Sequence, residues 1–190
     1  KLRMNGLQCL TGLENMTGLE TLCVADDAEI TLESNPGTLD FEKLAGYRRA
    51  GINRLSMGLQ SACDKELAML GRIHNFDAFV QNYKQARRAG FENINVDLMS
   101  ALPGQTVESW EQTLVKTAEL APEHLSAYSL IIEEGTPFWN WYGEDANQTL
   151  RPKEMLPLPS EEDERRMYAR TREILEQYGY HRYEISNYAK

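Results

Sequence analysis

Residues 94–98 read Ile-Asn-Val-Asp-Leu, and this alternation of apolar and polar side chains predicts a β-strand. A Leu-Pro-Gly-Gln-Thr loop follows at residues 102–106, and a helical pattern then runs from Val107 to Leu120. A strand that a short loop joins to a helix is the repeating unit of parallel sheets with crossover helices. This stretch therefore predicts the α/β fold class.

The same rhythm extends to both sides of this stretch. Upstream, the pattern predicts two strands and three helices, in the order 30–34, 40–51, 54–59, 64–70 and 75–90. Asp40 and Asn75 are the expected helix caps there. Downstream, a strand is predicted at 125–132, a helix capped by Ser160 runs to Tyr178, and residues 183–186 predict a final strand. The chain thus repeats the βα unit several times.

Composition limits the classes of partner. The chain has 190 residues, of which 42% are hydrophobic, so it is long enough to bury a core. Its formal charge of −9 disfavours nucleic acid and anionic lipid as partners. No apolar run approaches the roughly 18 residues of a membrane-spanning helix, and no export signal follows Lys1. We therefore expect a cytoplasmic protein without a transmembrane segment.

The cysteines and histidines predict no metal site in this chain. Cys9, Cys23 and Cys63 are odd in number and widely spaced, which argues against disulfides and favours a reducing compartment. The histidines are also widely separated, so none has the i, i+4 spacing of metal ligands. We expect loop or strand-edge positions for all three, which are His74, His124 and His181.

Polar side chains lie near the ends of three predicted strands. Glu33 ends the first strand, Gln60 directly follows the second, and Asp97 lies near the end of the third. Arg72 lies just beyond the short helix that follows Gln60. Because the carboxyl ends of parallel strands share one mouth, we expect these four residues to meet. A guanidinium that grips a carboxylate, with side chains that accept from ribose hydroxyls or an ammonium group, fits a nucleoside amino acid.

Each of these residues also has a different interpretation. Asp97 would cap a loop, Arg72 would form a surface ion pair, and Gln60 would satisfy backbone groups. A second enzymatic hypothesis makes Glu33 and Asp97 a general acid and base, as in barrel glycosidases. The sequence leaves these alternatives open.

Several strings resemble one protein family. Residues 29–38 read Glu-Ile-Thr-Leu-Glu-Ser-Asn-Pro-Gly-Thr, and residues 51–60 read Gly-Ile-Asn-Arg-Leu-Ser-Met-Gly-Leu-Gln. The strings at 70–72, 95–98, 102–106 and 126–138 follow in the family's order. Together they resemble the radical S-adenosylmethionine (SAM) family that contains oxygen-independent coproporphyrinogen III oxidase and its relative, the heme chaperone. Residues 130–138 and 183–190 are more similar to the heme-chaperone branch.

The resemblance implies a fold and a ligand site. It implies part of a (β/α) TIM barrel at residues 29–135, with a C-terminal part at 136–190 and a poorly defined helical lead-in at 1–28. Glu33, Gln60, Arg72 and Asp97 match family residues that hold SAM. In the family's arrangement Arg72 would bind the SAM carboxylate, Gln60 and Asp97 the ribose hydroxyls, and Glu33 would lie near the amino acid or ribose.

The resemblance also implies cofactors and partners. These are SAM, a 4Fe–4S cluster, and heme as cargo for heme-accepting proteins in the cytoplasm. The chain departs from the family because the Cys-x3-Cys-x2-Cys motif and a glycine-rich run expected upstream are absent, as is a His-Asn…Tyr-Trp segment expected downstream. We therefore expect a fragment, incomplete at both ends, that is inactive alone because the cluster ligands lie outside it, and that tends to self-associate.

One local departure concerns the loop after residue 98. Ser100 and Ala101 precede Leu102, where the family more often has a glycine. At the level of function, two alternatives stay open beside the heme chaperone. One is a coproporphyrinogen III oxidase of porphyrin biosynthesis, and the other is a noncatalytic remnant or binding module.

Overall fold

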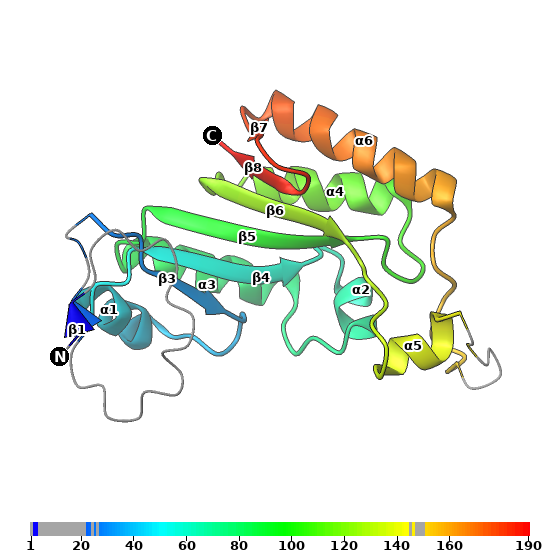
Figure 1. The fold of residues 1–190 in the computed structure, drawn as a ribbon, viewed down its shortest axis with the longest axis horizontal. Coiled ribbons are helices and arrows are strands. Elements are labelled where there is room, and N and C mark those ends of the chain that lie inside the picture. Colours follow the sequence, from blue (N-terminus) through cyan, green and yellow to red (C-terminus); the bar gives the residue numbers. More distant parts are fainter. Residues whose placement is uncertain (1, 4–21, 24, 26, 145, 147–150) are drawn as a thin grey trace. The chain divides into compact units, whose positions relative to one another are not determined.

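The computed structural model describes residues 2–3, 22–23, 25, 27–144, 146 and 151–190 (Figure 1). The chain divides into two compact units, residues 1–30 and residues 31–190. In the first unit, β1 (Leu2–Arg3) and β2 (Leu22–Cys23) form a parallel pair. The helical lead-in predicted for residues 1–28 otherwise falls on residues outside the described ones.

The second unit alternates strands and helices, as the α/β prediction requires. The elements are β3 (Thr31–Ser34), α1 (Phe41–Arg49), β4 (Arg54–Gln60), α2 (Asp64–Met69), α3 (Phe76–Arg88), β5 (Asn93–Ser100), α4 (Val107–Ala118), β6 (His124–Ser129), α5 (Pro137–Tyr142), α6 (Glu161–Gln177), β7 (His181–Arg182) and β8 (Asn187–Ala189). The predicted fold class is confirmed. No helix among the described residues is long and apolar enough to cross a membrane.

Helices α1, α3 and α6 begin where a side chain accepts a hydrogen bond from one of their first free amides. Asp40 Oδ1 accepts from the Lys43 amide at 2.8 Å, and Asn75 Oδ1 accepts from the Ala78 amide at 2.8 Å. Ser160 Oγ accepts in the same way from the third residue of α6. All three caps were predicted, because Ser, Asp and Asn offer an oxygen to the orphan N–H groups of a helix start.

The sheet of the second unit has the strand order β3-β4-β5-β6-β8-β7. Neighbouring strands from β3 to β6 are parallel, which confirms the prediction of parallel barrel-type strands. The last two strands run antiparallel: β8 pairs with β6, and β7 pairs with β8. The sheet is therefore mixed, with a short hairpin at one edge.

The final strand predicted at 183–186 is wrong. These residues form the turn that joins β7 to β8. The Glu184 carboxylate accepts hydrogen bonds from the Ser186 amide at 3.1 Å and from Asn187 Nδ2 at 2.9 Å. These bonds, the Ser186 amide first, hold the pKa of Glu184 below its ordinary value. A side chain that binds the nearby backbone competes with strand pairing, and here it favours the turn.

Strand β6 ends at Ser129, earlier than the predicted end at residue 132. Its parallel partner β5 ends at Ser100, and Ala101 then turns away with φ at 60°. The Leu130 amide donates to the Ser100 carbonyl at 2.9 Å, and the ladder stops there. The β-rich composition of the next residues did not produce a strand, because β5 gives them no partner.

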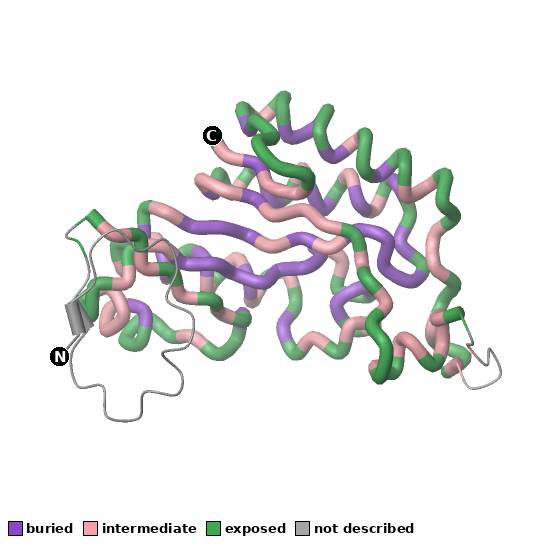
Figure 2. Tube along the Cα trace, viewed as in Figure 1, coloured by how far each residue is buried: buried purple, intermediate pink, exposed green. Residues whose placement is uncertain are grey.

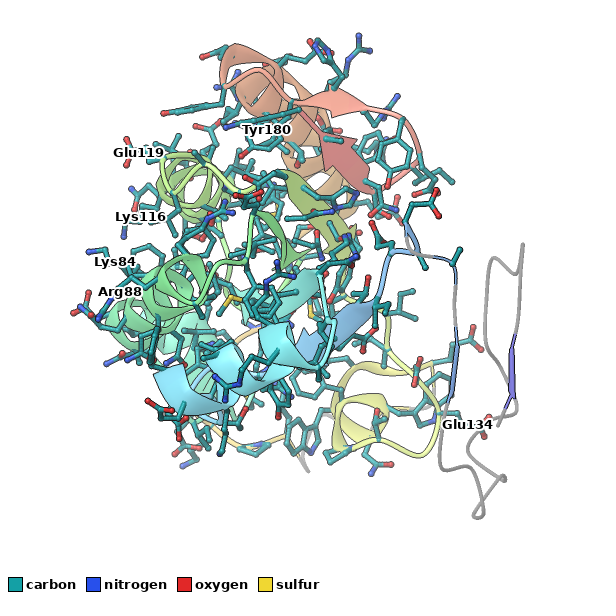
Figure 3. The ribbon with its side chains drawn as sticks, turned by 90° about the vertical axis from the view of Figure 1, so that its left-hand side faces the viewer. Lys84, Arg88, Lys116, Glu119, Glu134 and Tyr180 are labelled. Atoms are coloured by element: carbon teal, nitrogen blue, oxygen red, sulfur yellow. The ribbon has the colours of Figure 1, made fainter. Side chains whose placement is uncertain are left out.

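Helices α1, α3, α4 and α6 cover one face of the sheet. Figure 3 shows α3 and α4 beside the strands, with Lys84, Arg88, Lys116 and Glu119 pointing away from them. The buried tube segments in Figure 2 run through the middle of β4 and β5. The core side chains of these strands alternate along the chain and are Leu55, Met57, Leu59, Ile94, Val96 and Leu98.

The opposite face of the same strands is polar. Parallel register places Ser56 beside Asn95, and Asp97 beside Ser126, so these side chains share one face. Parallel strands that helices cover on both faces are usually apolar throughout, and these strands are not. The alternation thus gives the sheet one face for packing and one face for polar contacts, which is the face that carries the site.

Candidate functional site

The candidate site centres on a glycine in β4. Gly58 has no side chain, and a Cβ atom there would lie 2.9 Å from Gln60 Nε2 and 3.5 Å from Asn35 Oδ1. The register places Asp97 directly beside Gly58. Two amide groups and one carboxylate therefore lie around Gly58, which is buried, and the close approach of Gln60 requires glycine there.

Gln60 reaches this position through an unusual backbone conformation. It is the last residue of β4, its φ is 70°, and the register with β5 shifts between Gly58 and Gln60. A left-handed conformation costs a residue with a Cβ atom roughly 1–2 kcal/mol. The side chain is 5% exposed and accepts a hydrogen bond from the Tyr128 hydroxyl at 3.3 Å. Gln60 thus forms a hydrogen bond with a side chain on another strand. The alternative interpretation from the sequence, in which Gln60 satisfies backbone groups, required bonds to the main chain instead.

Asp97 lies inside β5 rather than near its end. Asn95 Nδ2 donates to Asp97 Oδ1 at 2.7 Å, and Ser56 Oγ donates to Asp97 Oδ2 at 3.0 Å. Each carboxylate oxygen therefore has one protein donor and retains acceptor capacity for a ligand. The idea that Asp97 caps a loop is wrong, because its donors lie on β4 and β5.

Glu33 and Arg72 approach from the β3 side. Glu33 pairs in register with Ser56, which puts its exposed side chain on the polar face. Arg72 follows α2, and its Nη1 donates to Asn35 Oδ1 at 3.1 Å. The guanidinium therefore reaches the same amide that borders Gly58. This contact replaces the surface ion pair that was the alternative for Arg72.

All four predicted residues influence the pKa of the Tyr128 hydroxyl. Burial raises the pKa of Tyr128 above its ordinary value of 10.0, and the charges of Asp97 and Glu33 raise it further. The hydrogen bond to Gln60 and the charge of Arg72 act in the opposite direction. The phenol thus stays protonated at neutral pH, and its hydrogen-bond partner among these four residues is Gln60.

Sequence reasoning missed Tyr128, Asn35 and Gly58 as site residues. The alternation in β6 contained a signal for Tyr128, because it lies two residues after Ser126 and hence on the same face. Asn35 and Gly58 carried no such signal. Their role depends on the approach of Arg72 and Gln60, which only the tertiary structure defines.

A buried network supports the loops behind the site. Glu66 in α2 is 4% exposed, and its carboxylate accepts from Ser61 Oγ at 2.6 Å, Gln105 Nε2 at 2.9 Å and Ser109 Oγ at 2.7 Å. These donors come from the turn after β4, the loop after β5 and the first turn of α4. A buried carboxylate needs such donors, so the network ties together the two loops that follow β4 and β5.

The histidines occupy three different settings. His74 is buried in a loop, with Nε2 at 3.3 Å from the Leu59 carbonyl. His181 belongs to the edge strand β7. His124 is the first residue of β6, which lies between β5 and β8. The hairpin β7–β8 extends the sheet beyond β6 and makes it an interior strand.

Comparisons with known proteins agree with this architecture. The sequence profile described as the Radical SAM superfamily matches residues 9–116, which is more than half of the chain. The chain belongs to the radical SAM superfamily. The resemblance seen in the sequence motifs is therefore confirmed.

The relatives of this radical SAM chain are HemW- and HemN-like. It is 42% identical over 166 residues to "Heme chaperone HemW" of Bacillus subtilis, covering 87% of this chain and 41% of that protein. It is 37% identical to "Radical S-adenosyl methionine domain-containing protein 1, mitochondrial" of Bos taurus, covering 86% and 35%. It superposes on coproporphyrinogen III oxidase (HemN) of Escherichia coli with a TM-score of 0.74, 28% identity and coverage of 89% and 37%. The chain thus spans less than half the length of these relatives.

Radical SAM proteins in general use SAM and a 4Fe–4S cluster. In the part of this radical SAM chain that the structure describes, no three His, Cys, Asp or Glu side chains are grouped to hold a metal. The half-buried Cys63 stands at the N-cap position of α2, and its thiol makes no hydrogen bond to the helix. The polar groups near Gly58 are of kinds that can bind SAM, because a guanidinium binds a carboxylate and carboxylates accept from hydroxyl or ammonium groups.

The loop after β5 has a backbone conformation that glycine adopts easily. Ala101 has φ at 60°, in the left-handed region that glycine enters at little cost. Ala101 is 3% exposed, so the strained residue is also packed. The chain therefore keeps the loop shape with alanine, at some cost in stability.

Proposed function

We propose that residues 31–190 hold SAM on the polar face of the sheet, around Gly58. Arg72 binds the SAM carboxylate, Gln60 and Asp97 bind the ribose hydroxyls, and Glu33 lies beside the amino acid or ribose. The arrangement around Gly58 is the observation that carries the proposal: Asp97 lies beside it in register, Gln60 Nε2 and Asn35 Oδ1 border it, and Arg72 donates to that Asn35 oxygen at 3.1 Å. SAM with a 4Fe–4S cluster supplies one-electron chemistry in this superfamily.

The protein residues contribute binding and orientation. Arg72 is already held by Asn35 at 3.1 Å, so its guanidinium is placed before a ligand arrives. Asp97 is fixed through both oxygens. Such preorganisation lowers the entropy that a ligand must lose to bind in one orientation. Figure 1 shows α2 and α5 beyond the carboxyl ends of β4 and β6, where a shared mouth is expected.

We propose further that the whole protein is a cytoplasmic heme chaperone with heme as cargo and heme-accepting proteins as partners. The support is the 42% identity to a protein named as a heme chaperone. The second candidate is an oxygen-independent coproporphyrinogen III oxidase, which the superposition on HemN favours. Self-association of the 190-residue chain also stays a prediction.

One experiment separates the two candidates. The longest form of the protein that contains these residues is purified anaerobically, its cluster is reconstituted, and it is assayed for heme binding and for coproporphyrinogen decarboxylation with SAM. A chaperone binds heme stoichiometrically, transfers it to apo-acceptors and gives no porphyrinogen turnover. Turnover that depends on SAM replaces the first proposal with the second. Sedimentation of the 190-residue chain over a range of concentrations tests self-association.

A further inference from the structure

A hydrogen-bonded group of side chains lies beside the ligand residues on the polar face. Its centre is Asn95 in β5, which is 3% exposed. Asn95 Nδ2 donates to Ser56 Oγ at 2.7 Å and to Asp97 Oδ1 at 2.7 Å. Asn95 Oδ1 lies 2.6 Å from His124 Nδ1 and 3.2 Å from Ser126 Oγ, whose single hydrogen it shares with Asn187 Oδ1 at 3.0 Å. Both atoms of the amide group therefore have protein partners.

These neighbours allow one orientation of the Asn95 amide. In the reversed orientation its oxygen would face Asp97 Oδ1, and both atoms are acceptors. Because the Asn95 oxygen only accepts, His124 Nδ1 carries a hydrogen and donates. His124 Nε2 lies 2.6 Å from the Tyr183 hydroxyl, so the imidazole is held from its other side by the β7–β8 turn.

The fixed amide in turn fixes the Asp97 carboxylate. Asn95 holds one oxygen of Asp97 and Ser56 holds the other, while the Ser56 hydroxyl accepts from Asn95. The three side chains close a ring of hydrogen bonds. The carboxylate then presents two oxygens in a set plane, and two acceptors side by side match two neighbouring hydroxyl groups.

We propose that Asn95 is a positioning residue that orients Asp97 toward the ribose diol of SAM and thereby sets the preference for a ligand with both hydroxyls. This inference rests on the proposed function, in which Asp97 binds the ribose. Asn95 acts through Asp97, because both of its amide atoms are already bound by protein groups. The consequence is that ribose recognition depends on a residue that needs no contact with the ligand.

The isosteric change Asn95→Asp tests this role, because it puts an acceptor opposite Asp97 in place of a donor. In the longest form of the protein, we expect it to weaken SAM binding at least about tenfold by calorimetry, the scale of a charged hydrogen bond. The ratio of affinities for SAM and its 2′-deoxy derivative should fall toward one. Asn140→Asp, an exposed change in α5 with the same charge, is the control and should alter neither value.

A double-mutant cycle separates positioning from folding. If Asn95 acts through Asp97, Asn95→Ala weakens SAM binding in the native background and has little further effect beside Asp97→Ala. Equal losses in both backgrounds overturn the inference, because Asn95 would then support only the fold. Should the Asn95 variants melt early, Ser56→Ala removes the second donor to Asp97 and is expected to weaken SAM binding about threefold.

The cycle also distinguishes this inference from the proposed function. If Asp97→Ala leaves SAM affinity unchanged, the proposed ribose contact fails and the inference fails with it. If Asp97→Ala weakens binding while Asn95→Asp and Ser56→Ala do not, Asp97 binds the ligand without help, and the inference alone is overturned.

Discussion

The Tyr128 hydroxyl donates a hydrogen bond to Gln60 Oε1 at 3.3 Å, which connects β6 to the end of β4 across the intervening strand β5. This bond occupies the oxygen of the amide. It leaves Gln60 Nε2 above Gly58, where a Cβ atom would lie 2.9 Å away. The amide therefore offers its N–H groups to a ligand, so it would donate to a ribose oxygen rather than accept from a hydroxyl.

Tyr128→Phe should reduce SAM affinity about threefold to tenfold, because the Gln60 amide loses the bond that orients it. The measurement is titration calorimetry with SAM. Tyr142→Phe is the matched control. Tyr142 is the last residue of α5, and this change removes a phenol hydroxyl that donates to the Leu156 carbonyl. Equal affinities of Tyr128→Phe and the native protein would show that Gln60 keeps its orientation without the phenol.

Gly58→Ala should reduce SAM affinity by about tenfold or more, because the added methyl group meets Gln60 Nε2 and narrows the approach to β4. Gly46→Ala in α1 is the control, where a new Cβ would meet only the flexible end of the Arg49 side chain, at 3.8 Å. That change should leave SAM binding unaltered and raise the free energy of unfolding by about 0.5–1 kcal/mol. A Gly58→Ala protein with native affinity would mean that the ligand does not approach β4.

Arg72→Ala should weaken SAM binding by about 1.5–3 kcal/mol, the scale of a hydrogen bond to a charged group. Arg88→Ala, which removes a guanidinium from the opposite side of the helix layer, should leave the affinity unchanged (Figure 3). Calorimetry at two salt concentrations separates a direct contact from a general effect of charge, because screening acts mainly on the latter. Unchanged affinity of Arg72→Ala excludes it as the carboxylate ligand.

The local parts of this structure were predictable and the non-local parts were not. The caps Asp40 and Asn75 act within one helical turn, so the sequence alone placed them. The alternation at residues 94–98 likewise placed Asn95 and Asp97 on one face. By contrast, the orientation of the Gln60 amide depends on a φ of 70° and on a tyrosine two strands away. A contact between residues so far apart in the chain produces no periodic pattern in the sequence from which it could be predicted.

Ala101→Gly should raise the free energy of unfolding by about 1 kcal/mol, because glycine adopts a φ of 60° with little strain. Thermal or denaturant unfolding measures the change. Ala68→Gly, in the exposed part of α2, should instead lower stability by about 1 kcal/mol, since glycine is unfavourable inside a helix. Destabilisation by both changes would argue that the Ala101 methyl group contributes more through packing than it loses through strain.

His74 should make stability fall in mild acid. Burial lowers its pKa below the ordinary 6.5, and the charge of Arg72 lowers it further, while the Leu59 carbonyl and Asp64 oppose the shift. At pH values between 6.5 and the lowered pKa of the folded state, His74 binds more protons in the unfolded chain than in the folded chain. The stability contribution is therefore complete above pH 6.5 and is lost as the pH falls through the folded pKa.

The variant His74→Gln isolates this contribution, because its amide donates to the Leu59 carbonyl without titrating. Denaturant unfolding is measured at about pH 5 and about pH 7.5 for both proteins. The native protein should lose more stability between the two values than His74→Gln, since other acid-titrating groups act equally in both. Arg72→Ala should narrow the difference, because the pKa of His74 then moves back toward its ordinary value. Identical losses in the native protein and His74→Gln would show that the imidazole is equally protonated in the folded and unfolded chains.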